Sequence, residues 1–185
     1  MSESLRIRPA SVDDAASIAR VHVETWQSAY AGILPDEYLI GLDIADETRK
    51  WRTLLAGDRA DTVALVAECT EETGRRTVVG FGTAGPAQDV NLLYDGEVYT
   101  LYVAPDWQGR DLGQRLLGAL LRSLFERGME DAIVWVLAGN ASRFFYEHMG
   151  AQQIAQRHER VAGESVSSMA YGWSDLEAWL RQTGM

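Results

Sequence analysis

The feature of this sequence that most constrains its fold is a succession of strand, glycine turn and helix between residues 97 and 127. Pro105 cannot donate a backbone hydrogen bond, so we expect the strand to end before it. Leucines then recur at helical spacing from Leu112, and Gly128 is a typical residue just beyond a helix C-terminus. The run EVYTLYV is rich in β-branched and aromatic side chains, and its alternation predicts one strand face that carries Glu97, Tyr99, Leu101 and Val103.

The turn over residues 108–113 predicts a site for an anion. The first backbone N–H groups of a helix have no partner inside the helix and lie at the positive end of its dipole. Gly109 and Gly113 let the chain turn tightly and let a phosphate approach the backbone. The turn does not match the Rossmann fingerprint, and no Gly-Lys-Ser/Thr follows it as in phosphate-binding NTPase loops. A nucleotide-hydrolysing domain is therefore disfavoured.

The same turn, QGRDLG, resembles the acyl-CoA motif Gln/Arg-x-x-Gly-x-Gly/Ala of the GCN5-related N-acetyltransferase (GNAT) family. In that family, the backbone amides of this turn bind the pyrophosphate of the cofactor. One position departs from the pattern, because Asp111 stands where a second glycine is usual. The resemblance implies acetyl-CoA as co-substrate, bound by Leu101, Tyr102, Val103, Gln108, Gly109, Arg110, Asp111, Leu112, Gly113, Gln114, Asn140, Phe145 and Tyr146.

Two further stretches resemble this family. Residues 140–150, NASRFFYEHMG, are similar to its second signature, and residues 25–35 are similar to the first-helix region of many small bacterial members. The implied fold is a single α/β (α+β) GNAT domain over residues 1–185, with a mixed central sheet, a splayed parallel strand pair and flanking helices. The residue pattern itself predicts hairpins over residues 62–83 and 152–173, a strand over 131–137 parallel to that at 97–103, and a last helix capped by Ser174.

Acetyl transfer to an amine needs a base and an acid, because an aliphatic amine with a pKa of about 10 arrives protonated and a thiolate leaves more easily beside a proton donor. The resemblance implies Tyr146 as the acid; the alternative is a core tyrosine that bonds a backbone carbonyl. Glu97 lies where some family members carry a catalytic base. Its alternatives are a solvated residue at the strand entrance, or a base role taken by a water chain. Asn140 is a predicted helix cap, and in the family it also contacts the pantetheine arm.

Aromatic side chains at four positions are candidates for the acceptor cleft: Trp26, Tyr30, Tyr94 and Tyr99. Trp26 and Tyr30 share a helix face with His22, a pattern that is also typical of core packing. The expected acceptor is a primary amine of a small molecule or peptide, and the sequence does not identify which. A rival interpretation, suggested by Asp111, is an acyl-CoA-binding sensor or regulatory module with little or no transfer.

The composition limits the kinds of partner, metal site and location that are expected for this protein. A net charge of −10 disfavours nucleic acid and anionic membranes. The single Cys69 excludes an internal disulfide, and the three histidines are scattered, so no metal site is predicted. No apolar run has membrane-spanning length and no signal-peptide core is present, so a cytoplasmic location is expected. Aromatic residues in the final segment, 171–180, predict a homodimer if some of them lie on an exposed apolar patch.

Overall fold

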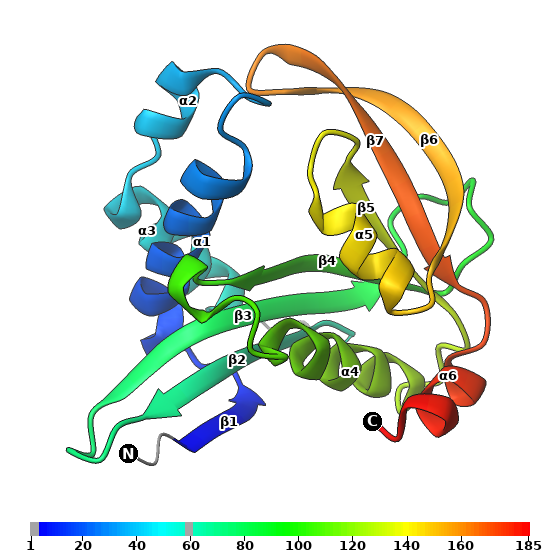
Figure 1. The fold of residues 1–185 in the computed structure, drawn as a ribbon, viewed down its shortest axis with the longest axis horizontal. Coiled ribbons are helices and arrows are strands. Elements are labelled where there is room, and N and C mark those ends of the chain that lie inside the picture. The colour runs from blue at the N-terminus through cyan, green and yellow to red at the C-terminus, as the bar shows by residue number, and fades with distance from the viewer. Residues whose placement is uncertain (1–3, 58–60) are drawn as a thin grey trace.

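The computed structural model describes residues 4–57 and 61–185. Its centre is a seven-stranded mixed sheet with the strand order β1-β2-β3-β4-β5-β7-β6 (Figure 1). Only β4 and β5 pair in parallel among the described strands, and the predicted hairpins are β2–β3 and β6–β7. The strands are β1 (Ser4–Pro9), β2 (Val63–Thr70), β3 (Arg76–Pro86), β4 (Gly96–Val103), β5 (Ala132–Leu137), β6 (Gln152–Val161) and β7 (Glu164–Trp173).

Helices pack against both faces of this sheet. On one face, Leu116 and Leu120 of α4 are fully buried against β2–β4. On the other face, Ile18 of α1 packs with Phe81 of β3. Gly82 of β3 lets α4 lie close, because a Cβ there would be only 2.6 Å from Leu120 Cδ1. The helices are α1 (Ala15–Ala29), α2 (Asp36–Ile40), α3 (Ile44–Ala56), α4 (Leu112–Phe125), α5 (Ser142–His148) and α6 (Leu176–Thr183).

The parallel strands β4 and β5 separate soon after they begin. They pair at Gly96–Ala132, Glu97–Ile133 and Val98–Val134, and the pairing ends there. Residues 99–103 of β4 therefore keep their partners on β3 while their other edge faces an opening. The predicted splayed pair is confirmed, and it leaves backbone groups of both strands available to a ligand.

A β-bulge in β4 changes which side chains share a face. Thr83 pairs with Thr100 and Ala84 pairs with Val98, so Tyr99 is an extra residue between them. Beyond the bulge, Leu101 packs with Val98 against α4, although strict alternation would place these side chains on opposite faces. The expectation that Glu97 and Leu101 share a face was wrong, because the alternation assumed an unbroken strand.

The last helix and the end of β7 correct two further expectations. The N-cap of α6 is Asp175 rather than Ser174, since the Asp175 carboxylate accepts the Ala178 N–H at 2.8 Å. Tyr171, Trp173 and Trp179 are at most 8% exposed, so the expected aromatic patch in this segment was wrong. Homodimerisation stays a prediction without that support. Among the described residues, no helix is long and apolar enough to cross a membrane.

Candidate active site

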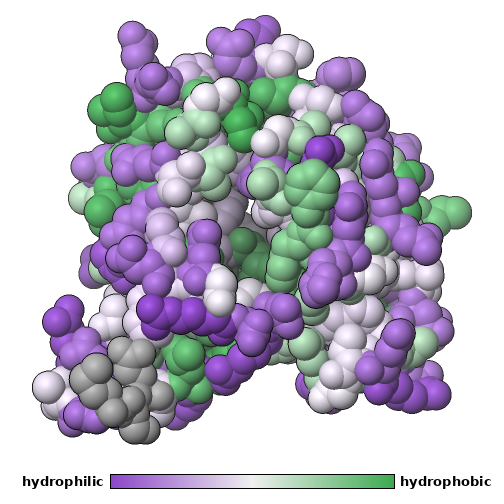
Figure 2. Space-filling view, in the orientation of Figure 1, coloured by the Kyte–Doolittle hydropathy of each residue, from purple (hydrophilic) through white to green (hydrophobic). Residues whose placement is uncertain are grey.

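The separation of β4 from β5 opens a cleft of about 640 Å³. Its walls come from α1, the second half of β4, the turn 108–114, β5 and the start of α5. Figure 2 shows the surface hollowed near the centre of this view, and the ribbon in the same orientation places α1 and α5 on opposite sides of that region (Figure 1). Residues 99–103 of β4 all line the cleft, so an extended ligand can lie along the free edge of this strand.

The turn before α4 has the geometry of an anion site. Gly109 has a φ of 72°, and a Cβ built on it would meet no atom within 4 Å. The first backbone hydrogen bond of α4 runs from the Arg115 N–H to the Asp111 carbonyl, at 3.0 Å. The N–H groups of residues 112–114 precede this bond and therefore have no acceptor within the helix. Because these amides lie at the positive end of a 14-residue helix, a phosphate group fits here.

Asp111, the departure from the family motif, is the N-cap of α4 with a φ of 57°. A left-handed backbone is the conformation for which glycine is preferred, and aspartate adopts it more readily than most residues. The residue is exposed, so its carboxylate is accessible to solvent. Arg110 stacks over the Trp107 ring at 4.8 Å, and Arg115 donates to the Leu5 carbonyl at 3.3 Å. The sequence places both arginines within four residues of Asp111, so they are predicted to offset its negative charge, and this stays a prediction.

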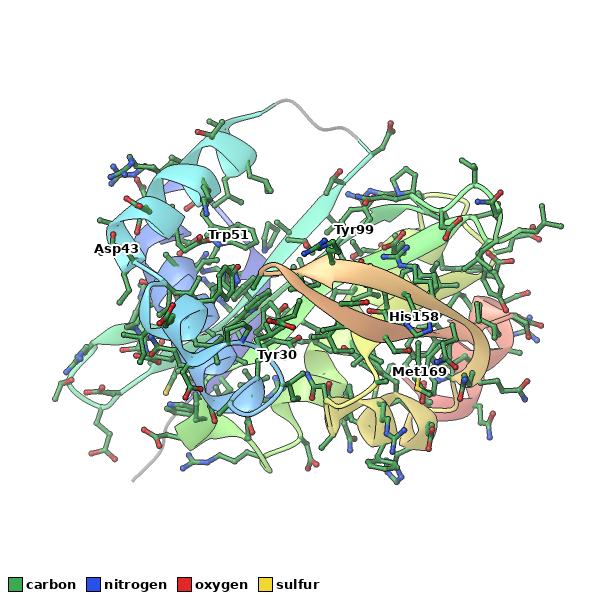
Figure 3. The ribbon with its side chains drawn as sticks, turned by 90° about the horizontal axis from the view of Figure 1, so that it is seen from above. Tyr30, Asp43, Trp51, Tyr99, His158 and Met169 are labelled. Atoms are coloured by element: carbon green, nitrogen blue, oxygen red, sulfur yellow. The ribbon has the colours of Figure 1, made fainter. Side chains whose placement is uncertain are left out.

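Most of the predicted site residues lie together around this cleft. Of the predicted binding residues, the lining contains Tyr30, Tyr99, Leu101, Tyr102, Val103, Gln108, Gly109, Asp111, Leu112, Gly113, Gln114, Asn140, Phe145 and Tyr146. Figure 3 shows Tyr30 and Tyr99 on either side of the β6–β7 hairpin when the molecule is viewed from above. Four predicted residues lie outside the lining: Trp26, Tyr94, Glu97 and Arg110.

Trp26 and Tyr94 do not reach the cleft for identifiable reasons. The Trp26 ring packs behind Tyr30, with ring centroids 4.8 Å apart, so it supports the wall rather than forming it. Tyr94 lies in the loop after β3, and its hydroxyl is 2.8 Å from the place where Gly172 would carry a Cβ. Tyr94 therefore packs on β7, and its assignment to the acceptor cleft is not supported by this position.

Tyr146 is the buried hydroxyl of the cleft. Tyr146 lies on α5 and is 6% exposed, and its ring makes an edge contact with the Phe145 ring, with 5.2 Å between the centroids. Burial raises the pKa of Tyr146 well above its usual value, and the neighbouring Tyr30 raises it further. A neutral hydroxyl that lines a cleft can donate a proton or a hydrogen bond there, which a tyrosine bonded inside the core cannot do.

Asn140 lines the same cleft and lies at the start of α5, whose N-cap is Ala141, so the predicted N-cap position is one residue too early. The Oδ1 of Asn140 accepts the Ser142 backbone N–H at 2.9 Å. Burial raises the pKa of Tyr30 in the same cleft, and Asn140 opposes this shift.

Glu97 is a buried carboxylate behind the cleft rather than in its wall. The residue is 8% exposed, and its Oε2 accepts the Gln88 backbone N–H at 2.8 Å. Burial raises the pKa of Glu97, Asp89 acts in the same direction, and the Gln88 bond and Arg157 oppose the shift. Tyr99 and Thr100, two and three positions further along β4, line the cleft, whereas Glu97 does not.

Several lining residues were not predicted from the sequence. Thr25 and Ser28 lie in the last turn or so of α1, and Trp135 lies on β5 with Arg157 stacked 3.9 Å above its ring. Trp135 could have been predicted from the sequence, because it lies in the strand expected to separate from β4. In residues 4–57 and 61–185, no group of three or more His, Cys, Asp or Glu side chains is arranged to hold a metal ion.

Comparison with known proteins gives the same assignment as the geometry. The model of the acetyltransferase (GNAT) family matches residues 23–151. The chain belongs to the GNAT family. The uncharacterized N-acetyltransferase YuaI of Bacillus subtilis is 31% identical over 172 residues, which is 93% of this chain and 94% of that protein. This GNAT protein is accordingly an enzyme of the N-acetyltransferase type.

Solved structures agree with the fold of this GNAT protein. The PaiA N-acetyltransferase of Thermoplasma acidophilum, solved with coenzyme A, has a TM-score of 0.65 at 21% identity over 92% of this chain and 99% of that one. YncA of Salmonella typhimurium, solved with acetyl-CoA, has a TM-score of 0.64 at 22% identity over 94% of both chains. These likenesses show the α/β GNAT fold, with its mixed seven-stranded sheet and the parallel pair β4–β5.

Proposed function

We propose that this chain transfers the acetyl group of acetyl-CoA to a primary amine of a small molecule or peptide, by direct attack of the amine on the thioester. The observation that carries the proposal is a single cleft with two chemically different parts. The unpaired amides of α4 and Gly109 lie along it at the turn 108–114, and the buried hydroxyl of Tyr146 lies along it at α5. One part suits phosphate groups and the other suits a departing thiolate.

The free edge of β4 connects these two parts. Residues 101–103 line the cleft, and their edge toward β5 lacks a strand partner. An extended amide-containing arm, such as the pantetheine of acetyl-CoA, can pair with such an edge as an added strand does. Gln108 steadies the end of this edge, because its Nε2 donates to the Val103 carbonyl at 3.0 Å.

In the proposed roles, Tyr146 is the general acid and Glu97 supplies the base. Tyr146 stays protonated at neutral pH because burial raises its pKa, so a proton is available for the thiolate. Glu97 does not line the cleft, so a water molecule would have to link its carboxylate to an amine there. The raised pKa of Glu97 favours proton uptake relative to an exposed glutamate.

An amine panel with acetyl-CoA tests the proposal, with release of free CoA thiol as the signal. We expect at least one primary amine to give thiol release above that of acetyl-CoA alone. Tyr146→Phe should then lower kcat by about a hundredfold or more with little change in KM for acetyl-CoA. Binding of acetyl-CoA without acetylation of any amine would contradict the proposed transfer and support the sensor function instead.

The assembly state is tested separately. We also propose a homodimer, although the aromatic residues that suggested it are buried in the chain's own core. Light scattering at micromolar concentration that gives a mass near 20.5 kDa would exclude it.

A further inference from the structure

Thr83 of β3 and Thr100 of β4 form a hydroxyl pair where the sheet opens. The two residues are partners across the strands, and their Oγ1 atoms are 2.7 Å apart. Thr100 lies two positions beyond Val98, at which the pairing of β4 with β5 ends, and it lines the cleft. Thr83 is 4% exposed and is not part of the cleft lining. The pair therefore joins a buried hydroxyl to a residue of the cleft wall.

The burial of Thr83 decides which hydroxyl donates. Among the described residues, the Thr100 hydroxyl is the only side-chain hydrogen-bond partner of the Thr83 hydroxyl. If Thr100 donated, the buried proton of Thr83 would have no acceptor, which is costly. If Thr83 donates, both protons are satisfied, because the Thr100 proton can reach water or a ligand in the cleft. Thr100 then keeps one lone pair and its own proton, since a hydroxyl accepts two hydrogen bonds and donates one.

The bulge in β4 puts Thr100 on the same face of the strand as Glu97. Val98 and Leu101 both pack in the core with α4, so the residue before each of them lies on the opposite face. Three residues of extended strand span about 10 Å. The Glu97 Oε2 accepts the Gln88 N–H at 2.8 Å, and the described residues give the Oε1 no hydrogen bond. One or two water molecules can therefore connect this oxygen with the Thr100 hydroxyl.

We propose that Thr100 is a catalytic residue of the acetyl transfer, whose hydroxyl contacts the attacking amine and relays its proton toward Glu97. This inference rests on the proposed function, and in particular on Glu97 as the base. It supplies the connection that Glu97 needs, because Thr100 lines the cleft and Glu97 does not. Thr83 orients the relay, since its bond leaves Thr100 with one acceptor and one donor site.

The protons of the reaction balance along this path. The Thr100 oxygen takes a proton from the protonated amine while the Thr100 proton passes through water to Glu97, which releases it to solvent. The neutral amine then forms a bond to the thioester carbonyl carbon. Its nitrogen loses a second proton along the same path, the carbon–sulfur bond breaks, and the sulfur takes the proton of Tyr146. Tyr146 regains a proton from solvent.

Two substitutions at Thr100 separate the hydroxyl from the shape of the side chain, with an amine that the wild type acetylates and free CoA thiol as the signal. Thr100→Val removes the hydroxyl and keeps the branched side chain, and it should lower kcat by about a hundredfold, the lower end of the range for proton transfer by a side chain. Thr100→Ser keeps the hydroxyl and should stay within about fivefold of the wild type. The KM for acetyl-CoA should change by less than about threefold in both. Full kcat in Thr100→Val would overturn the proposal.

The path to Glu97 is tested by a double-mutant cycle. Glu97→Gln alone should also lower kcat, most strongly at acid pH, where less free amine is present. Because both groups move the same proton, adding Glu97→Gln to Thr100→Val should lower kcat by less than about threefold further. Multiplicative losses in the double variant would overturn the relay, and so would full kcat in Glu97→Gln.

Melting temperatures without any substrate test the hydroxyl pair itself. Thr100→Val leaves the buried proton of Thr83 without an acceptor and should lower the melting temperature by about 3–8 °C. Thr83→Val leaves a Thr100 oxygen that water in the cleft can solvate, so the change should be less than about 2 °C. A larger fall in Thr83→Val than in Thr100→Val would make Thr100 the donor and overturn the proposal.

Thr77→Val is the matched control, because Thr77 lies on the same strand, β3, and outside the cleft lining. No described residue forms a hydrogen bond with its side chain, so kcat and the melting temperature should stay unchanged. If no amine is acetylated by the wild type, the proposed function fails, while the melting temperatures still judge the direction of the Thr83–Thr100 bond.

Discussion

Replacing Asp111 with glycine tests whether the departure from the GNAT motif weakens the cofactor site. Asp111 holds a φ of 57°, where a residue with a Cβ pays about 1 kcal/mol relative to glycine. Glycine removes this cost but gives the unfolded chain extra freedom, which lowers stability by about 0.4–1 kcal/mol. Because these two effects oppose each other, we expect the melting temperature to change by less than about 3 °C.

The effect on CoA affinity follows from the charge of the exposed Asp111 side chain. Two unit charges about 7 Å apart in water interact by roughly 0.6 kcal/mol. Salt with a Debye length of about 8 Å reduces this to less than half, so two phosphate charges together give about 0.5 kcal/mol. Loss of the carboxylate should therefore tighten CoA binding by less than about fivefold.

Titration calorimetry with CoA at low and physiological salt measures this change. Asp111→Asn is the matched variant, because it removes the charge and keeps the Cβ that glycine lacks. Asp106→Asn, at an exposed carboxylate in the preceding 3₁₀ turn, is the control for a general loss of surface charge. A hundredfold gain in affinity for Asp111→Gly would refute the reasoning and would show a cofactor site weakened by its own sequence, as a sensor would need.

Three further predictions follow from other parts of the structure. Gly109→Val combined with Gly113→Val should abolish the rise in melting temperature that saturating CoA gives the wild type, because valine is strained at a φ of 72° and its side chain obstructs the amides; an unchanged rise would place the cofactor elsewhere. Glu97→Gln should raise the melting temperature at neutral pH but not below about pH 4. Burial raises the pKa of Glu97, so ionisation of this carboxyl group lowers the stability of the folded state as the pH rises. Identical melting temperatures of variant and wild type at every pH would contradict a buried carboxylate. Arg8→Met should destabilise the protein at neutral pH and make its stability depend less on pH below about pH 4. Hydrogen bonds from Arg8 are the main cause that lowers the pKa values of Asp14 and Glu68, so the stability these carboxylates contribute is lost as the pH falls. An unchanged dependence of stability on acid pH in the variant would contradict this role of the network.

The helices, strands and turns that depend on local chemistry could be predicted from the sequence. The strand, glycine turn and α4 follow from β-branched residues, Pro105, two glycines and leucines at helical spacing. The hairpins and the parallel β5 follow in the same way, because alternation, apolar runs and turn residues act within a few positions of one another. The anion-binding turn was predictable for that reason, since its amides and its glycine belong to six consecutive residues.

Which distant side chains share the cleft depends on the tertiary structure. Tyr30, Tyr102 and Tyr146 belong to the C-cap of α1, to β4 and to α5, and no spacing in the sequence predicts that they line one cleft. The bulge at Tyr99 reversed the face expected for Glu97, because pairing with β3, not the residue pattern of β4, sets the register. Local periodicity fixes the direction of a side chain relative to its own element, whereas its neighbours depend on how separate elements pack. The arrangement of the side chains that line the cleft is therefore a property of the folded chain.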